Sequence, residues 1–352
     1  MLIDLMKILI PATVAFAFGI LITPIATHFF YKHKMWKKKI RTETVSSSEF
    51  SKIHKAKEVS EVSTPCVGGI IVWVSVFAVV LLFYLISLIF PQNPFWGGLN
   101  FFSRSQTLLP LGVFFLGAIL GLFDDLLEIT GRSNITRDSS WYTKLKLSII
   151  VLIGATAGWW FYTKLGMDAI HLPWGGLLYL GIWFVPFVVI VMLATFSGGV
   201  IDGIDGLSGG VLSAIFAAYS VIAYADNQID LAALSLVISG ATLAFLWFNI
   251  PPARFYMGET GMMPLTIVLA TFAFLTDTVL LLPIIALPLA VTSFSSSSQL
   301  IAKKFGKKIF KVAPLHHHFE ALGWPSYKVT MRYWVLSVMF AIIGVILAIM
   351  TK

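Results

Sequence analysis

The sequence predicts an all-α, polytopic integral membrane protein. Of its 352 residues, 58% are hydrophobic and only 12% are charged, about half the charged share of a typical soluble domain. The mean hydropathy is +0.88, and the one cysteine, Cys66, allows neither an intramolecular disulfide nor a cysteine zinc cluster. These observations exclude an ordinary soluble globule, a disordered chain and a disulfide-rich secreted domain. The whole chain, 1–352, is predicted to form a single transmembrane domain.

Ten apolar stretches approach or exceed the length of about 20 residues with which a helix crosses a bilayer. In chain order they lie near 8–30, 69–90, 108–123, 147–163, 174–195, 208–225, 231–248, 262–275, 278–296 and 331–350. The eighth and ninth stretches are nearly continuous, so a count of nine stays open. No small-residue cleavage site follows the first stretch, which is therefore not expected to be a removable signal peptide. The outer loop at 91–106 is expected to form a small hairpin or helix.

Lysine and arginine fall mostly on one side of the predicted bundle. One set of segments holds 21 of the 25 Lys and Arg residues and the opposite set holds four. The first set consists of the loops at 32–67, 124–146, 197–207, 249–261 and 297–330, together with Arg332. By the positive-inside rule these five loops face the cytoplasm and both termini lie outside, which favours ten spans over nine. The net charge of +8 is then explained by anionic lipid and not by nucleic-acid binding.

Five acidic residues stand where predicted cytoplasmic loops meet spans: Asp124, Asp125, Asp202, Asp205 and Glu259. Carboxylates at a membrane edge are costly unless they are paired, hydrated or bound to a cation. A divalent cation would relieve the repulsion between Asp124 and Asp125, although a solvated helix end explains such a pair on its own. Asp202 and Asp205 share one face if their segment is helical, whereas a simple N-cap explains only one of them. Acids from three loops on one side predict one composite site.

Other polar side chains are predicted on the same side. His316, His317 and His318 cannot all face one metal ion from a regular helix, because successive residues turn by about 100°. On a loop, these histidines would present several imidazoles to an anionic substrate. Asn249 lies at a Pro-Pro turn, which an ordinary interhelical connection would also explain. Lys146, at the start of the fourth span, would either bind phosphate or anchor the helix at the interface.

These motifs occur in a characteristic order. They are TPCVGG at 64–69, the acidic pair at 124–125, DGIDGL at 202–207, FNIPPA at 248–253, MGETG at 257–261 and HHHFE–GW at 316–324. Together they resemble the MraY family, the phospho-N-acetylmuramoyl-pentapeptide-transferases, within the polyprenyl-phosphate N-acetylhexosamine-1-phosphate transferase superfamily. The acidic motifs are typical of the superfamily. HHHFE–GW favours the MraY branch over the GlcNAc-1-phosphate branch.

The resemblance implies a reaction and a set of roles. UDP-MurNAc-pentapeptide would donate phospho-MurNAc-pentapeptide to undecaprenyl phosphate, giving lipid I and UMP, at the cytoplasmic face of the bacterial inner membrane. It also implies Mg²⁺ as cofactor, held by Asp202, and a homodimer. The expected catalytic residues are Asp124, Asp125, Asp202, Glu259 and His317. The expected substrate-binding residues are Thr64, Lys146, Asp205, Asn249, Gly258, His316 and His318.

Two other functions stay open at this point. One is a related polyprenyl-phosphate transferase that uses UDP-GlcNAc. The other is a non-catalytic membrane protein that handles or transports lipid. A transporter is expected to carry ionisable or broken segments at mid-span, whereas the predicted spans here carry almost none, so the sequence favours an enzyme.

The chain also departs from the family pattern at several positions. TPCVGG stands where TPTMGG is usual. Glu61 stands where a lysine is usual, so Lys55 or Lys57 would have to supply that positive charge. Phe196 and Gly199 replace two usual asparagines before the DGIDGL motif, and Glu259 replaces a usual aspartate. A usual glutamine aligns with Ser298, next to Gln299. These changes predict a divergent transferase, a shifted substrate or a weakened activity.

Overall fold

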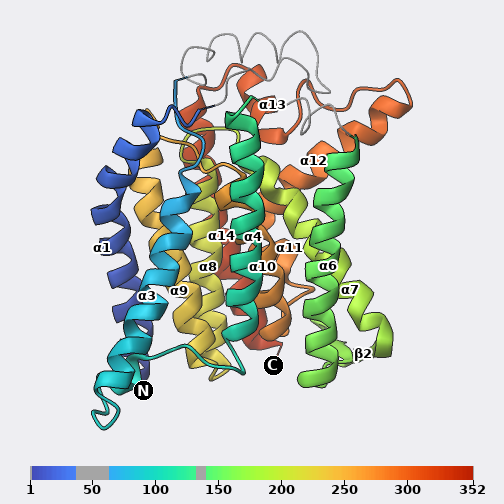
Figure 1. Cartoon of the computed structure of the whole chain (residues 1–352). Helices are drawn as coiled ribbons and strands as arrows, with labels where there is room; N and C mark the ends of the chain where they lie inside the picture. Colours follow the sequence, from blue (N-terminus) through green and yellow to red (C-terminus); the bar gives the residue numbers. More distant parts are fainter. Residues whose placement is uncertain (1, 37–62, 132–139, 352) are drawn as a thin grey trace.

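Long apolar helices run side by side in one bundle (Figure 1). The computed structural model describes residues 2–36, 63–131 and 140–351. The helices are α1 (Leu2–Lys32), α3 (Gly69–Ile89), α4 (Leu108–Ile129), α6 (Ser140–Lys164), α7 (Phe184–Ser197), α8 (Leu207–Ala225), α9 (Ile229–Asn249), α10 (Glu259–Leu275), α11 (Leu282–Ile285), α12 (Leu287–Lys304), α13 (Leu315–Ala321) and α14 (Ser326–Met350). The short elements are the 3₁₀ turns η1 (Gly97–Leu99), η2 (Gly181–Trp183) and η3 (Gly198–Ile201) and the strands β1 (Ala169–His171) and β2 (Leu177–Tyr179).

The prediction of an all-α polytopic membrane protein is confirmed. Among the described residues, eight helices are long and apolar enough to cross a membrane, and α10 is shorter, with 17 residues. The predicted ninth span, 278–296, is not one helix, because the chain bends at Ala286 between α11 and α12. Pro288 explains the break, since proline has no amide hydrogen and its ring clashes with the carbonyl four residues earlier.

Two other predicted boundaries were wrong. The fifth stretch was placed at 174–195, but residues Leu177–Tyr179 form β2 and the helical segment begins at Gly181. The third stretch was ended at 123, but α4 continues to Ile129. This last turn and a half of α4 carries Asp124 and Asp125, and both side chains are buried.

Helices α8 and α9 form the centre of the bundle. In their most apolar windows 72% and 78% of the residues are buried, against 28–50% in the other six long helices. Helix α1 packs along α9, and the approach is close at Gly240. A β-carbon on Gly240 would lie 2.5 Å from the carbonyl oxygen of Ala12. Small residues at such contacts let membrane helices approach each other closely.

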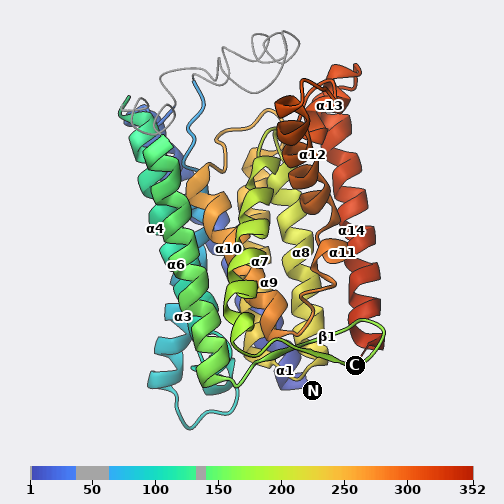
Figure 2. The same ribbon diagram turned by 90° about the vertical axis from the view of Figure 1, so that its right-hand side faces the viewer.

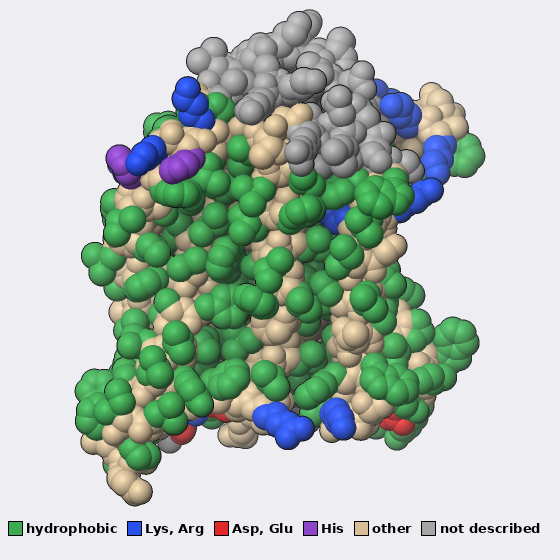
Figure 3. Space-filling model, viewed as in Figure 1, with side chains coloured by type: hydrophobic (Ala, Val, Ile, Leu, Met, Phe, Trp, Pro, Cys, Tyr) green, Lys and Arg blue, Asp and Glu red, His purple; other side chains and the backbone are tan. Residues whose placement is uncertain are grey.

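One end of the bundle carries both chain termini and the other carries α13 (Figure 1). The surface between the two ends is mostly hydrophobic, while Lys and Arg gather toward the ends (Figure 3). This arrangement fits an even number of crossings. The end with the termini is called the terminal end below, and the opposite end is called the loop end. The predicted orientation, with the loop end in the cytoplasm, stays a prediction.

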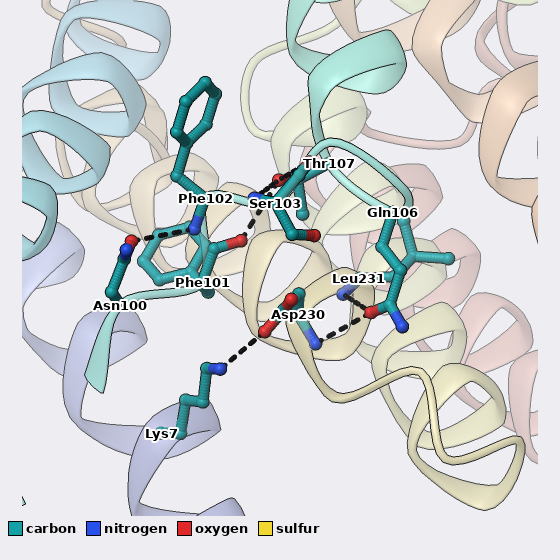
Figure 4. Close-up of polar contacts among 9 residues, drawn as sticks. All are labelled: Lys7, Asn100, Phe101, Phe102, Ser103, Gln106, Thr107, Asp230 and Leu231. Carbon is teal, nitrogen blue, oxygen red and sulfur yellow. Dashed lines mark hydrogen bonds and ion pairs between the residues drawn. The ribbon is translucent and has the colours of Figure 1, made fainter. Parts of the chain in front are cut away.

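At the terminal end, polar contacts join α1, the start of α9 and the segment before α4 (Figure 4). Lys7 on α1 forms an ion pair with Asp230 on α9 at 2.5 Å. The side-chain oxygen of Gln106 accepts the amide hydrogens of Asp230 and Leu231 at the start of α9. The loop predicted as a hairpin or helix contains the single 3₁₀ turn η1. At the same end the hairpin β1–β2 (Figure 2) is held by an ion pair between His171 and Asp277.

The close approach at Gly240 yields a stability prediction. We expect Gly240→Ala to lower the free energy of unfolding by about 1–3 kcal/mol, because the added methyl group collides with backbone on α1. Thermal unfolding of the purified protein in detergent measures the change. The matched control is Gly112→Ala on α4, where a β-carbon meets nothing within 4 Å. Equal unfolding temperatures for the two variants would contradict the packing argument.

Candidate active site

The acidic turn, residues 202–206, lies between η3 and α8 at the loop end. This segment is a turn, whereas a helix would have placed Asp202 and Asp205 on one face. Asp202 Oδ1 accepts a hydrogen bond from the Ser208 hydroxyl at 2.7 Å, and Oδ2 accepts one from the Gly258 amide at 3.3 Å. A carboxylate offers about four lone-pair sites, so these two bonds are compatible with a bound cation.

The second acid of this turn is tied to the segment that connects α9 to α10. Asp205 Oδ2 accepts the amide hydrogen of Ala253 at 3.2 Å. Asn249 is buried between the same two segments, where its Oδ1 accepts the Gly206 amide and its Nδ2 donates to the Phe255 carbonyl, both at 2.8 Å. The prediction that Asn249 binds substrate stays a prediction; in the structure both ends of its side chain are bonded to backbone.

Asp124 and Asp125, the acidic pair on α4, have different bonding partners. Asp125 accepts the amide hydrogens of Glu259 at 3.2 Å and Thr260 at 2.8 Å, and so caps the N-terminus of α10 from a neighbouring helix. Asp124 faces the other way, where Lys146 Nζ lies 3.0 Å from its Oδ2. Adjacent residues on a helix point about 100° apart, which explains the division.

Lys146 connects two of the predicted catalytic carboxylates. Its ammonium lies 3.0 Å from Asp124 and 3.6 Å from Glu259 Oε1, and its side chain is only 16% exposed. The ammonium also lies 5.9 Å from the ring centroid of Phe196, within the range of a cation–π contact. Lys146 is therefore held inside the site and is not an exposed interface anchor.

The TPCVGG segment supports the same region through its backbone. Tyr256 donates its amide hydrogen to the Pro65 carbonyl at 2.8 Å, and Gly68 donates to the Tyr256 carbonyl at 2.8 Å. Thr64 is buried beside these contacts. The Cys66 thiol is directed toward the Met35 carbonyl at 3.7 Å.

The three histidines lie on α13 and not on the loop that was predicted. His316 and His317 are buried, and a β-carbon on Gly203 would lie 2.5 and 2.7 Å from their Nε2 atoms. A side chain at position 203 would therefore displace the rings of His316 and His317. His318 points elsewhere, and its Nδ1 accepts the Lys311 amide hydrogen at 3.1 Å. Partial burial, together with the charge of Lys311, lowers the pKa of His318 below its ordinary value.

Three polar side chains at this site were not identified from the sequence: Ser208, Glu320 and Ser326. Glu320 Oε2 lies 2.7 Å from His317 Nδ1, and its Oε1 accepts the Ser326 hydroxyl at 2.5 Å. The spacing of His317 and Glu320 by three residues on a helix is the signal that could have revealed this pair.

The remaining departures from the family pattern lie in α12, in η3 and outside the described residues. Gln299 is buried, and its side-chain oxygen accepts the amides of Ile309 and Phe310. Ser298 donates to the Ser295 carbonyl within α12, and Gly199 lies in η3. Lys55, Lys57 and Glu61 lie outside the described residues.

An apolar helical bundle with acidic, lysine and histidine side chains gathered at one end fits a membrane-embedded enzyme, and the similarity to known proteins identifies its class as a transferase. Residues 107–277 match glycosyl transferase family 4. A phospho-N-acetylmuramoyl-pentapeptide-transferase of Chloroflexus aggregans is 31% identical over 98% of this chain and 90% of its own length. That of Anoxybacillus flavithermus is 32% identical over 96% of this chain and 97% of its own. The chain belongs to the phospho-N-acetylmuramoyl-pentapeptide-transferase family.

The capping role of Asp125 predicts a loss of stability. We expect Asp125→Ala to lower the free energy of unfolding by about 1–3 kcal/mol, because it leaves the buried Thr260 amide and the partly buried Glu259 amide without their acceptor. Thermal unfolding in detergent measures the change. The control is Glu259→Ala in the same helix turn, whose side chain is 37% exposed. An Asp125→Ala variant as stable as Glu259→Ala would contradict the assignment.

Proposed function

We propose that this chain transfers phospho-MurNAc-pentapeptide from UDP-MurNAc-pentapeptide to undecaprenyl phosphate, giving lipid I and UMP. The observation that carries the proposal is the meeting of the acidic turn, Lys146 and His317 at one end of an apolar bundle. A lipid phosphate reaches this end from the membrane face, and a soluble nucleotide donor reaches it from water. Family membership supports the same reaction.

The reaction brings several negative charges together, so the site has to neutralise them. Attack of the acceptor phosphate on the donor diphosphate joins two anions at one phosphorus. Lys146 carries a positive charge beside Asp124 and Glu259, and His317 directs a ring nitrogen at Gly203. Asp124 holds Lys146 in place. We assign Asp124 to positioning more than to proton removal, because a lipid phosphate is already largely ionised near neutral pH.

We propose Mg²⁺ as the cofactor and Asp202 as its protein ligand. Mg²⁺ commonly takes one or two carboxylates and completes its shell with waters and substrate phosphates. Within the described residues, no group of three or more His, Cys, Asp or Glu side chains is arranged to hold a metal ion, so substrate phosphates and waters would have to supply most of the ligands. Asp205 is the second carboxylate near that position. When bound, the ion would neutralise the diphosphate and stabilise the departing UMP.

The cellular setting is part of the proposal. The excess of Lys and Arg in the predicted cytoplasmic loops supports an active site on the cytoplasmic face of the bacterial inner membrane. A homodimer follows from the family resemblance alone.

The proposal is tested by UMP release from purified protein in detergent with undecaprenyl phosphate. UDP-MurNAc-pentapeptide and UDP-GlcNAc are supplied as parallel donors, each with and without Mg²⁺. We expect Mg²⁺-dependent release with the muramyl donor alone. Release with UDP-GlcNAc instead would move the chain to the sister branch, and no release from folded protein with either donor would overturn the proposal.

The role of Asp202 gives a separate prediction. We expect Asp202→Asn to lower kcat/KM by about 100-fold or more and to raise the Mg²⁺ concentration needed for half-maximal rate. Asp226→Asn, at the C-terminus of α8 on the terminal end, is the matched control and should leave the rate unchanged. Full turnover and unchanged Mg²⁺ dependence in Asp202→Asn would show that the metal assignment is wrong.

A further inference from the structure

A buried carboxylate lies behind the histidines. The side chains of His317 and Glu320 are each only 6% exposed, and His317 Nδ1 lies 2.7 Å from Glu320 Oε2. The other oxygen, Oε1, accepts the Ser326 hydroxyl at 2.5 Å. Ser326 begins α14, so the carboxylate connects α13 to the last helix. Burial of an ionised carboxylate is costly, and such hydrogen bonds offset the cost.

The geometry orients the ring of His317. Because an ionised carboxylate accepts hydrogen bonds and does not donate them, His317 Nδ1 carries the hydrogen in this contact. Nε2 is then the ring atom directed at the acidic turn, 2.7 Å from where a β-carbon on Gly203 would stand. A carboxylate behind a histidine fixes its orientation and tautomer in many sites.

The neighbouring histidine shows that this arrangement is specific. His318 Nδ1 accepts a hydrogen bond from a backbone amide, so that nitrogen carries no hydrogen. His317 therefore carries a hydrogen on Nδ1 and His318 does not, although the two residues are adjacent on one helix. A helix contact that served only to pack α13 against α14 would not require a charged partner for His317.

We propose that Glu320 is the positioning residue for His317. It accepts the Nδ1 hydrogen of His317 and holds Nε2 toward the acidic turn, where the diphosphate of the donor binds. The proposal rests on the proposed function for its catalytic meaning. Glu320 itself does not touch the substrate and acts only through the imidazole.

The test is a double-mutant cycle on the UMP-release rate. Glu320→Gln keeps the size of the side chain and an oxygen for the Ser326 hydroxyl. We expect it to lower kcat by about 10–100-fold, the range for residues that orient a reacting group through another, with a smaller change in KM. His317→Gln should lose at least as much, and the double variant should lose no more than His317→Gln alone.

A matched control separates positioning from packing. Gln299→Met removes a buried acceptor of two amides in the segment just before α13. The fold losses of rate in Gln299→Met and His317→Gln should multiply in the double variant, as expected for independent sites. Multiplying effects of Glu320→Gln and His317→Gln would overturn the proposal. If Glu320→Gln does not fold, Ser326→Ala takes its place, and its loss of rate should vanish in the His317→Gln background.

A second readout does not depend on activity. In protein labelled with ¹⁵N-histidine, the ring signals of His317 are identified by their loss in His317→Gln. We expect a hydrogen-bonded Nδ1–H signal that shifts in Glu320→Gln, while the His318 signals stay in place. An unchanged His317 ring in Glu320→Gln would overturn the positioning role even if the wild-type protein releases UMP. Conversely, a wild-type protein that shows the shift but releases no UMP would overturn only the proposed function.

Discussion

The site depends on one short segment whose backbone amides donate hydrogen bonds to carboxylates from elsewhere in the chain. Between Ala253 and Thr260, amide hydrogens are donated to the side chains of Asp205, Asp202 and Asp125. These acids come from α4 and from the acidic turn, which are far apart in the sequence. Carboxylates buried at the end of a membrane bundle are tolerated only when such donors are present. The connection from α9 to α10 therefore holds the acidic motifs together, and Asn249 fixes that connection at its start.

The sequence was sufficient for the broad architecture, but it named only part of the set of side chains that meet, since Ser208, Glu320 and Ser326 were not identified. Long apolar stretches and the one-sided distribution of Lys and Arg predicted the helices and the end that carries the polar motifs. What could not be predicted is how the polar groups are used. Asp125 and Asn249 belong to motifs that suggest substrate contact, yet they bond to backbone, because the helix end they satisfy comes from a distant segment. The break at Ala286 was likewise hidden inside a continuous apolar stretch, although its prolines signal it.

The family departures have physical explanations in the described region. Cys66 directs its sulfur at the Met35 carbonyl, so the thiol that replaces a usual hydroxyl has a backbone carbonyl as a partner. Phe196 places an aromatic ring near the Lys146 ammonium. A ring can stabilise a cation through its π face. Glu259 is longer than aspartate by one methylene group, and its carboxylate reaches to 3.6 Å from Lys146.

Repeated residues in this chain do not form uniform clusters. Asp124 binds a lysine while Asp125 caps a helix, and His317 faces a carboxylate while His318 accepts an amide hydrogen. In both cases the helix turns by about 100° between neighbours, so identical side chains enter different surroundings. The members of each pair therefore differ in role, with one bonded to the scaffold and the other directed at the site. A double aspartate or triple histidine here is best understood residue by residue, since the backbone rotation assigns each side chain its own partner.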